Sequence, residues 1–224
     1  MTQQDCPDSA AALPAILPVF PLEGVLLLPG GQLPLNIFEP RYLAMVEDAL
    51  KADRMIGMIQ PRNRAPEASG KGGDGALFET GCAGRITSFN ETDDGRYLIG
   101  LTGISRFNIT RELDMKHGYR RIAPDWTAYQ ADRNPAGCLD LDRQKLKIML
   151  KDYFALQGID CDWDAVDGAS DQKLITCLSM ICPFESSEKQ ALLEAACCRS
   201  RAVLFMGMLE MAICAGDGHG GGCH

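Results

Sequence analysis

The sequence has little histidine, and this shortage excludes several kinds of catalytic and metal site. Of the three histidines in the chain, only His117 lies outside the glycine-rich C-terminal end. A nucleophile–histidine–acid triad or a histidine-rich metal cluster therefore lacks parts. His219, Cys223 and His224 stand on a glycine tail without supporting residues, so we expect no metal site there and no cofactor elsewhere. His117 precedes Gly118, which is typical of a turn.

Paired-cysteine motifs are also absent, although the chain has ten cysteines. No Cys-x-x-Cys pair occurs, which removes the usual signatures of structural zinc and of thioredoxin-like redox chemistry. The chain is larger than a typical disulfide-stapled secreted domain. We therefore expect most of the cysteines to be reduced and buried, as small apolar side chains.

Long apolar runs and an excess of positive charge are missing too. No run approaches the roughly 18 apolar residues of a membrane span, and the N-terminus lacks the positive region of a signal peptide. We expect a cytoplasmic protein without membrane attachment. The formal net charge of −8 disfavours nucleic-acid binding through phosphate neutralisation.

A phosphate-binding loop for ATP hydrolysis is not present. The Walker A motif requires a glycine, four further residues, Gly-Lys, and then Ser or Thr. The one Gly-Lys pair, Gly70-Lys71, is followed by Gly72, and Ala65 stands where the first glycine belongs. The sequence therefore predicts no ATPase of this class.

Proline and short apolar runs dominate residues 17–42. Five of the twelve prolines lie in this stretch, between runs such as Val25–Leu28 and Leu33–Phe38. Proline cannot donate a hydrogen bond to a sheet, so it is typical of strand starts, edges and bulges. The pattern favours the first strands of a small barrel. From Pro40 the apolar residues repeat at helical spacing, which predicts a helix to about Asp53.

The hydrophobic period changes along the rest of the chain. Residues 55–126 predict strands with turn signals between them, together with a long loop at 62–75. From residue 138 the period becomes 3.6, which predicts helices. The last of these is expected to be one long helix over residues 188–215.

These elements predict an α+β protein in two parts. We expect a β-rich barrel subdomain at residues 13–126 and an α-helical bundle subdomain at residues 138–215. Flexible tails are expected at 1–12 and 216–224, because both segments lack apolar periodicity.

Several segments resemble the N-terminal (substrate-binding) domain family of Lon proteases, and above all its small free-standing bacterial members. They occur in the family's order and span roughly residues 13–213. The segments are Leu17–Leu22, Leu28–Gly30, Leu33–Tyr42, Met58–Pro61, Leu77–Ile86, Gly95–Phe107 and Glu188–Glu194, the last together with Arg199 and Arg201.

The resemblance implies a PUA-like twisted β-barrel followed by a C-terminal helical bundle. It also implies binding of protein substrates, whereas the ATPase and Ser–Lys protease domains of full-length Lon have no counterpart in this sequence. We expect a non-catalytic module that recognises unfolded proteins or peptides and acts as an adaptor or regulator of proteolysis, with a protease or chaperone as partner. The alternative is a PUA-like RNA- or nucleotide-binding module, against which the net charge counts.

Five residues are candidates for substrate contact: Phe38, Arg41, Arg62, Arg64 and Phe78. A long loop beside a rigid barrel often contributes to a binding site, and Arg62 and Arg64 lie at the start of such a loop. The alternatives are a local ion pair for Arg41, core positions for both phenylalanines, and a solvated loop. An exposed strand edge or an apolar groove between barrel and bundle would also accept a peptide.

Overall fold

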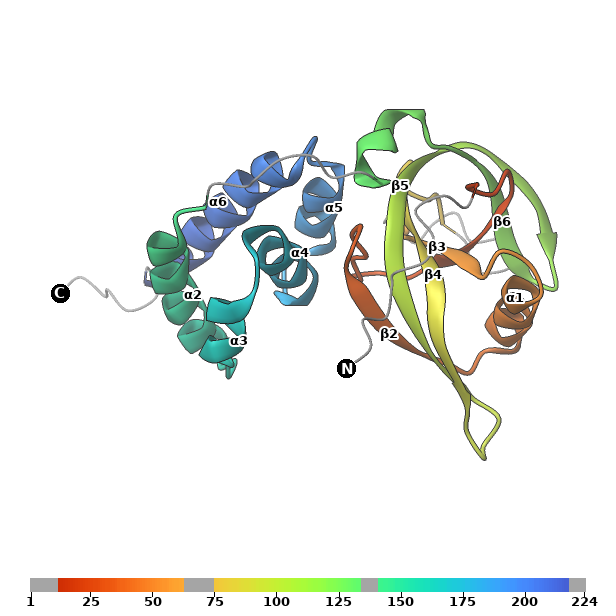
Figure 1. Cartoon of the computed structure of the whole chain (residues 1–224), viewed down its shortest axis with the longest axis horizontal. Coiled ribbons are helices and arrows are strands. Elements are labelled where there is room, and N and C mark those ends of the chain that lie inside the picture. Colours follow the sequence, from red (N-terminus) through yellow and green to blue (C-terminus); the bar gives the residue numbers. More distant parts are fainter. Residues whose placement is uncertain (1–11, 63–74, 134–140, 218–224) are drawn as a thin grey trace, which may run out of the picture.

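The strands form one mixed sheet that curls round to meet itself. The computed structural model describes residues 12–62, 75–133 and 141–217. Within these ranges the strands are β1 (Leu17–Pro21), β2 (Gln32–Ile37), β3 (Met55–Ile59), β4 (Thr80–Glu91), β5 (Tyr97–Lys116) and β6 (Tyr119–Asp125). Their order is β2-β5-β4-β3-β1-β6, with an additional pairing of β5 with β6. This pairing joins all the strands except β2 into a ring (Figure 1).

The ring closes unevenly, and one long strand, β5, pairs with two ring neighbours in turn. Its first part, from Tyr97 to Asn108, pairs with β4, and its second part, from Asn108 to Lys116, pairs with β6. Register shifts in both pairings bend the strand, as β-bulges do. Only β1 and β3 pair in parallel among the described strands. The expected α+β class is therefore confirmed.

One helix, α1 (Pro40–Leu50), packs beside β1 and β3. Pro40 occupies its first turn, where the missing N–H has no partner to lose. Its buried face includes Tyr42, which packs against Phe20 of β1 with 4.2 Å between ring centroids. The helix predicted from Pro40 is confirmed, although it ends earlier than expected.

The remaining helices follow the sheet in the chain. They are the 3-10 helix η2 (Thr127–Arg133), α2 (Arg143–Gln157), α3 (Trp163–Gly168), α4 (Asp171–Ile181), α5 (Ser186–Glu194) and α6 (Cys198–Asp217). Asp142 and Ser170 accept backbone N–H groups at the starts of α2 and α4. Gly158 ends α2 with a left-handed φ of 65°. Figure 1 shows α2–α6 gathered to one side of the curled sheet.

The prediction of a single long last helix is wrong. Two helices, α5 and α6, occupy that segment, and the chain is not helical between them. Arg106 donates hydrogen bonds to the carbonyls of Leu193 and Ala195, and Arg201 Nε donates to the carbonyl of Leu192. The last carbonyls of α5 therefore have side-chain donors in place of the N–H groups of a continued helix.

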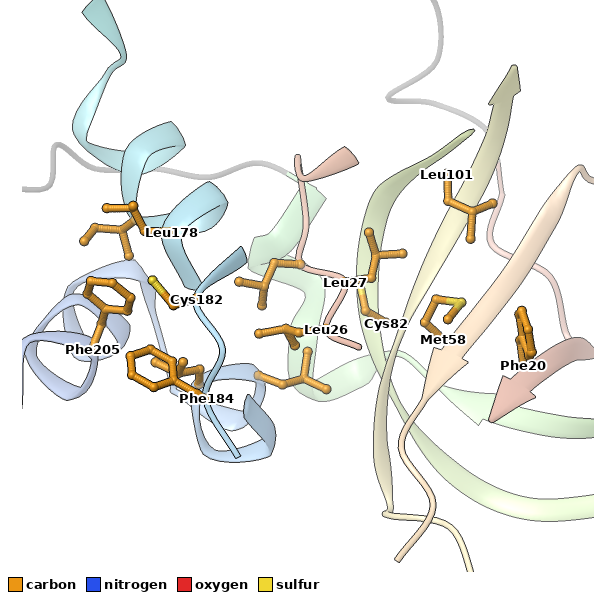
Figure 2. Packing of buried hydrophobic residues seen from close by; sticks show 14 of the residues in the cluster. Phe20, Leu26, Leu27, Met58, Cys82, Leu101, Leu178, Cys182, Phe184 and Phe205 are labelled. Carbon is orange, nitrogen blue, oxygen red and sulfur yellow. The ribbon is translucent and has the colours of Figure 1, made fainter. Parts of the chain in front are cut away.

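One hydrophobic core runs from the sheet into the helices. Leu26 and Leu27, between β1 and β2, belong to the same cluster as Phe184 and as Phe205 of α6 (Figure 2). A smaller cluster around Phe107 lies among the strands. The contact between sheet and helices is thus a packed interior.

The cysteines are more exposed than the sequence predicted. Those in the described ranges are free thiols, of which Cys82 and Cys182 are buried while Cys177, Cys197 and Cys214 are exposed. The expectation that most are buried is wrong for this part of the chain. Helical periodicity turns the thiols of Cys177 in α4 and Cys214 in α6 away from the packed faces of their helices, whereas Cys197 lies between α5 and α6.

The division into subdomains at 13–126 and 138–215 stays a prediction. The strands end before α2 begins, but the hydrophobic core is shared. The expected tails at 1–12 and 216–224, and the loop at 62–75, lie almost entirely outside the described residues.

Candidate functional site

The predicted site residues near β2 and α1 lie at the surface. Phe38 is 62% exposed, so the alternative that it is a core residue is wrong. The guanidinium carbon of Arg96 lies 5.8 Å from the centre of the Phe38 ring. Arg41 donates from Nε to Glu39 Oε2 at 3.1 Å and stacks on Tyr42. Arg41 therefore forms a local ion pair, which was the expected alternative to substrate contact for this residue.

Arg62 and Phe78, the other described candidates, lie together at the two ends of the long loop. The guanidinium carbon of Arg62 is 5.6 Å from the centre of the Phe78 ring. Arg64 lies outside the described residues. Substrate contact by these five residues stays a prediction.

His117 lies in the turn between β5 and β6, as Gly118 predicted. Its φ is 51°, and its Nε2 lies 3.9 Å from Asp48 Oδ2, with 60% of the histidine side chain exposed. The described residues include no group of three potential metal ligands. His219, Cys223 and His224 lie outside those residues.

An apolar groove of about 570 Å³ lies between the end of α2, the short α3 and α4. Buried residues of α2 and α4, among them Phe154, Leu174 and Leu178, form its floor. Ile159 and Ile181 also line it, with 37% and 69% of their surfaces exposed. Large apolar side chains gathered on a concave surface are typical of a binding site.

Local sequence explains why the groove stays open. Gly158 ends α2 in the left-handed conformation and turns the chain back. Asp162 then accepts two backbone N–H groups and starts α3. That helix has only six residues, because Ser170 already caps the next one. The short α3 separates α2 from α4 without covering the surface between them.

The rim of the groove is acidic. Asp160 and Asp162 line it and are exposed, and one cation, Lys173, stands on the α4 side. Close by, Asp167 is held by Lys147 Nζ at 2.6 Å. Carboxylates outnumber ammonium groups among the lining residues. The side chains that line the groove therefore carry a small excess of negative charge.

The contact between the sheet and α5 is filled by polar as well as apolar side chains. Gln60 donates to the carbonyl of Ser186 at 2.9 Å and to Gln190 Oε1 at 3.3 Å. Lys189 Nζ donates to the carbonyl of Gly24 at 2.7 Å. Burial lowers the pKa of Lys189. The apolar groove lies among the helices, and a peptide groove between barrel and bundle stays a prediction.

Arg106 of β5 forms a buried ion pair that sequence reasoning missed. Its Nε and Nη2 donate to the two carboxylate oxygens of Asp132, each at 2.8 Å. Burial opposes the charge, but the hydrogen bonds and charge of Asp132 raise the pKa of Arg106 overall. In the sequence, Arg106 stands out only as part of the Gly-x-x-Arg-Phe segment that ends at Phe107. This segment does not indicate that Arg106 is buried.

The groove and the fold define the class of the protein. An apolar concave surface with few polar side chains, carried by helices beside a curled sheet, is typical of a binding domain. A family model for the ATP-dependent protease La (LON) substrate-binding domain matches residues 16–210. The chain therefore belongs to the Lon substrate-binding domain family.

Curated relatives match the chain over about half of its length. "Lon protease 2" of Myxococcus xanthus is 31% identical over 113 residues, which are 50% of this chain and 13% of that protein. "Lon protease" of Anaeromyxobacter dehalogenans is 30% identical over 97 residues, 43% of this chain and 11% of that protein. The matched part is thus a small fraction of each relative.

Solved structures support the fold. A Lon N-terminal domain protein from Xanthomonas campestris superposes with a TM-score of 0.57 at 20% identity, covering 86% of this chain and 97% of that one. The N-terminal domain of a Mycobacterium avium complex Lon protease gives 0.59 at 14% identity, with 87% and 98% covered. None of the helices in the described residues is long and apolar enough to span a membrane.

Proposed function

We propose that this chain is a non-catalytic substrate-recognition module that binds unfolded or peptide segments of proteins. Membership of the Lon substrate-binding domain family supports protein substrates as the class. The groove between α2, α3 and α4 is the observation that carries the proposal. It combines buried apolar residues with exposed apolar residues along its edge.

Binding in the groove would rest on desolvation of apolar side chains. An extended or helical segment would cover Ile159 and Ile181, which now meet water. Burying one such side chain contributes roughly 1.5–3 kcal/mol. The carboxylates of Asp160 and Asp162 at the rim would select segments with a neighbouring Lys or Arg.

The module would hand its substrates to a protease or chaperone partner, as an adaptor or regulator of proteolysis. The family match covers a substrate-binding domain and not a catalytic one, so we expect neither ATPase nor peptidase activity from this chain. We also propose that the sheet is a PUA-like barrel, that the helices form a bundle, and that the protein is cytoplasmic. An acidic groove adds no support for the RNA- or nucleotide-binding alternative.

Fluorescence anisotropy with a labelled, permanently denatured model protein tests the proposal. Replacing Ile181 by Asp places a charge at the edge of the groove and should weaken binding by about tenfold or more. Val203→Asp is the matched control, because Val203 is 70% exposed and lies outside the groove, against 69% for Ile181. Equal affinities of the two variants would contradict a site in the groove.

A second pair of variants tests the site predicted beside the strands. One variant combines Phe38→Ala with Arg41→Ala, and the other combines Arg62→Ala with Arg64→Ala. If these changes weaken binding and Ile181→Asp does not, the substrate binds beside the sheet. Failure of every variant to change the affinity, or absence of binding by the unaltered chain, would reject the proposed function.

A further inference from the structure

A second cavity, of about 130 Å³, lies where the sheet, η2, α4 and the start of α6 meet. Gln172 and Thr176 of α4 line this cavity, whereas Lys173 and Cys177 line the groove. The cavity and the groove share no lining residue, so they are separate sites on different faces of α4.

Arg201 brings a buried guanidinium with unused donors to this cavity. The residue is 6% exposed, and its Nε donates to the carbonyl of Leu192 at 2.8 Å. This is the one hydrogen bond that the described part of the chain gives to the side chain. Neither terminal nitrogen has a hydrogen-bond acceptor among the described residues, so both can donate to a group in the cavity.

The carboxylate that lines the cavity is already engaged. Asp132 accepts hydrogen bonds from Nε and Nη2 of Arg106 at 2.8 Å and from its backbone N–H at 3.0 Å. Two guanidinium groups, those of Arg106 and Arg201, thus line a cavity that has one carboxylate. Burial, and then the charge of Arg106, lower the pKa of Arg201, as expected for an excess of positive charge.

Uncharged donors point to the same place. Thr176 is 5% exposed, and its hydroxyl has no hydrogen-bond partner among the described residues. Cys197 and Cys198 also line the cavity, at the N-terminus of the 20-residue helix α6. The N–H groups of a first helical turn carry partial positive charge. A guanidinium, a hydroxyl and a helix N-terminus together favour an anion.

We propose that this cavity binds a compact oxyanion, held by the Arg201 guanidinium, the Thr176 hydroxyl and the N-terminus of α6. A volume of about 130 Å³ suits a phosphate or carboxylate group and is smaller than pockets that enclose whole cofactors. The anion would balance the excess charge. It would also connect α4 and α6 with the Arg106–Asp132 pair of the sheet side.

Two sources supply such a group: inorganic phosphate in solution, and the C-terminal carboxylate of a protein segment. Both offer negatively charged oxygens to the same donors. The site does not depend on the groove, so it does not rest on the proposed function.

Isothermal titration calorimetry of the full chain with inorganic phosphate, at an ionic strength fixed with chloride, tests the proposal. We expect saturable binding that weakens by about tenfold or more in Arg201→Met, because charge-assisted hydrogen bonds are lost. Thr176→Val should weaken it by a smaller factor. Arg199→Met removes a charge from an exposed neighbour outside the cavity and should change the affinity by no more than about twofold.

Two further arms separate the possible outcomes. Thr176→Val keeps the shape of its side chain, so it carries the test if Arg201→Met does not fold, as judged by circular dichroism. If a peptide with a free C-terminus competes with phosphate and its amidated form does not, the site binds a terminal carboxylate. If phosphate binds and neither peptide competes, the site binds the inorganic ion. Ile181→Asp should keep the phosphate affinity, which separates this result from the groove. No saturable binding, or unchanged affinity in both cavity variants, would overturn the proposal.

Discussion

At the scale of single residues, burial sets the protonation of several side chains. Burial raises the pKa of Tyr153 from 10.0 to about 12 and that of Cys182 from 9.0 to about 12. Tyr153 is 2% exposed, and its ring centroid lies 5.8 Å from that of Phe184. A phenolate among these rings would lose its hydration, so the folded state favours the neutral phenol.

We therefore predict that Tyr153 contributes to a loss of stability in alkali. A group whose pKa is raised by folding stabilises the folded state below its unfolded pKa, and this contribution is lost as the pH rises through the folded pKa. For Tyr153 this window runs from pH 10.0 to about 12, and the free energy involved is on the order of 2 kcal/mol. Urea denaturation should show a shallower alkaline decline for Tyr153→Phe than for the unaltered chain.

The two proteins should be similar in stability near pH 7. The Tyr153 hydroxyl has no hydrogen-bond partner among the described residues, so its removal leaves no donor or acceptor unpaired. Parallel declines between pH 10 and 12 would show that Tyr153 ionises without a cost from burial.

At the scale of elements, the break between α5 and α6 depends on a side chain from the sheet. Arg106 donates from Nη1 to the carbonyls of Leu193 and Ala195, at 2.9 Å and 2.6 Å. The same guanidinium pairs with Asp132, which comes from η2. One residue of β5 therefore holds two helical segments in place.

We predict that Arg106→Leu strongly destabilises the protein. It leaves Asp132, whose side chain is 9% exposed, as a buried charge without its partner, a change that typically costs about 3–5 kcal/mol. Arg96→Leu is the control, because Arg96 pairs with Asp94 at 2.8 Å while half of its side chain is exposed. Such surface pairs contribute about 0–1 kcal/mol. Equal free energies of unfolding for the two variants would contradict a structural role for the buried pair.

At the scale of the whole molecule, the sheet and the helices share one interior. Leu26 and Phe205 belong to the same hydrophobic cluster, and Gln190 Nε2 donates to the carbonyl of Thr80 at 3.1 Å. Separation of the two parts would expose this apolar surface and leave buried polar groups unpaired. The two proposed subdomains should therefore not unfold independently.

The two tryptophans allow a direct measurement of this cooperativity. Trp126 lies beside Phe107 among the strands, and Trp163 lies beside Phe154 among the helices. In Trp163→Phe the remaining fluorescence reports on the sheet, and in Trp126→Phe it reports on the helices. We predict that each variant shows the same urea midpoint by fluorescence as by circular dichroism. Midpoints that differ between the two probes would indicate separate folding units.

Local signals account for much of what could be predicted. Pro40 predicted the start of α1. Ser170 caps α4 and Gly158 ends α2 by the same kind of local chemistry, because capping and turn formation depend on a few adjacent residues. The prediction failed at the break after α5, where the residues have ordinary helical spacing. The decisive donor, Arg106, lies 87 residues before its acceptor Leu193.

The sequence by itself determined the α+β class, most element positions and the family resemblance, because hydrophobic period, caps and short motifs are written along the chain. Only the tertiary structure decided which surfaces stay open. Phe38 is exposed, and the sheet and the helices share a hydrophobic core where they meet. The apolar groove arises between three consecutive helices, but the cavity at Arg201 arises between elements that are distant in sequence. Burial and charge balance at such places depend on packing in three dimensions, which no local pattern specifies.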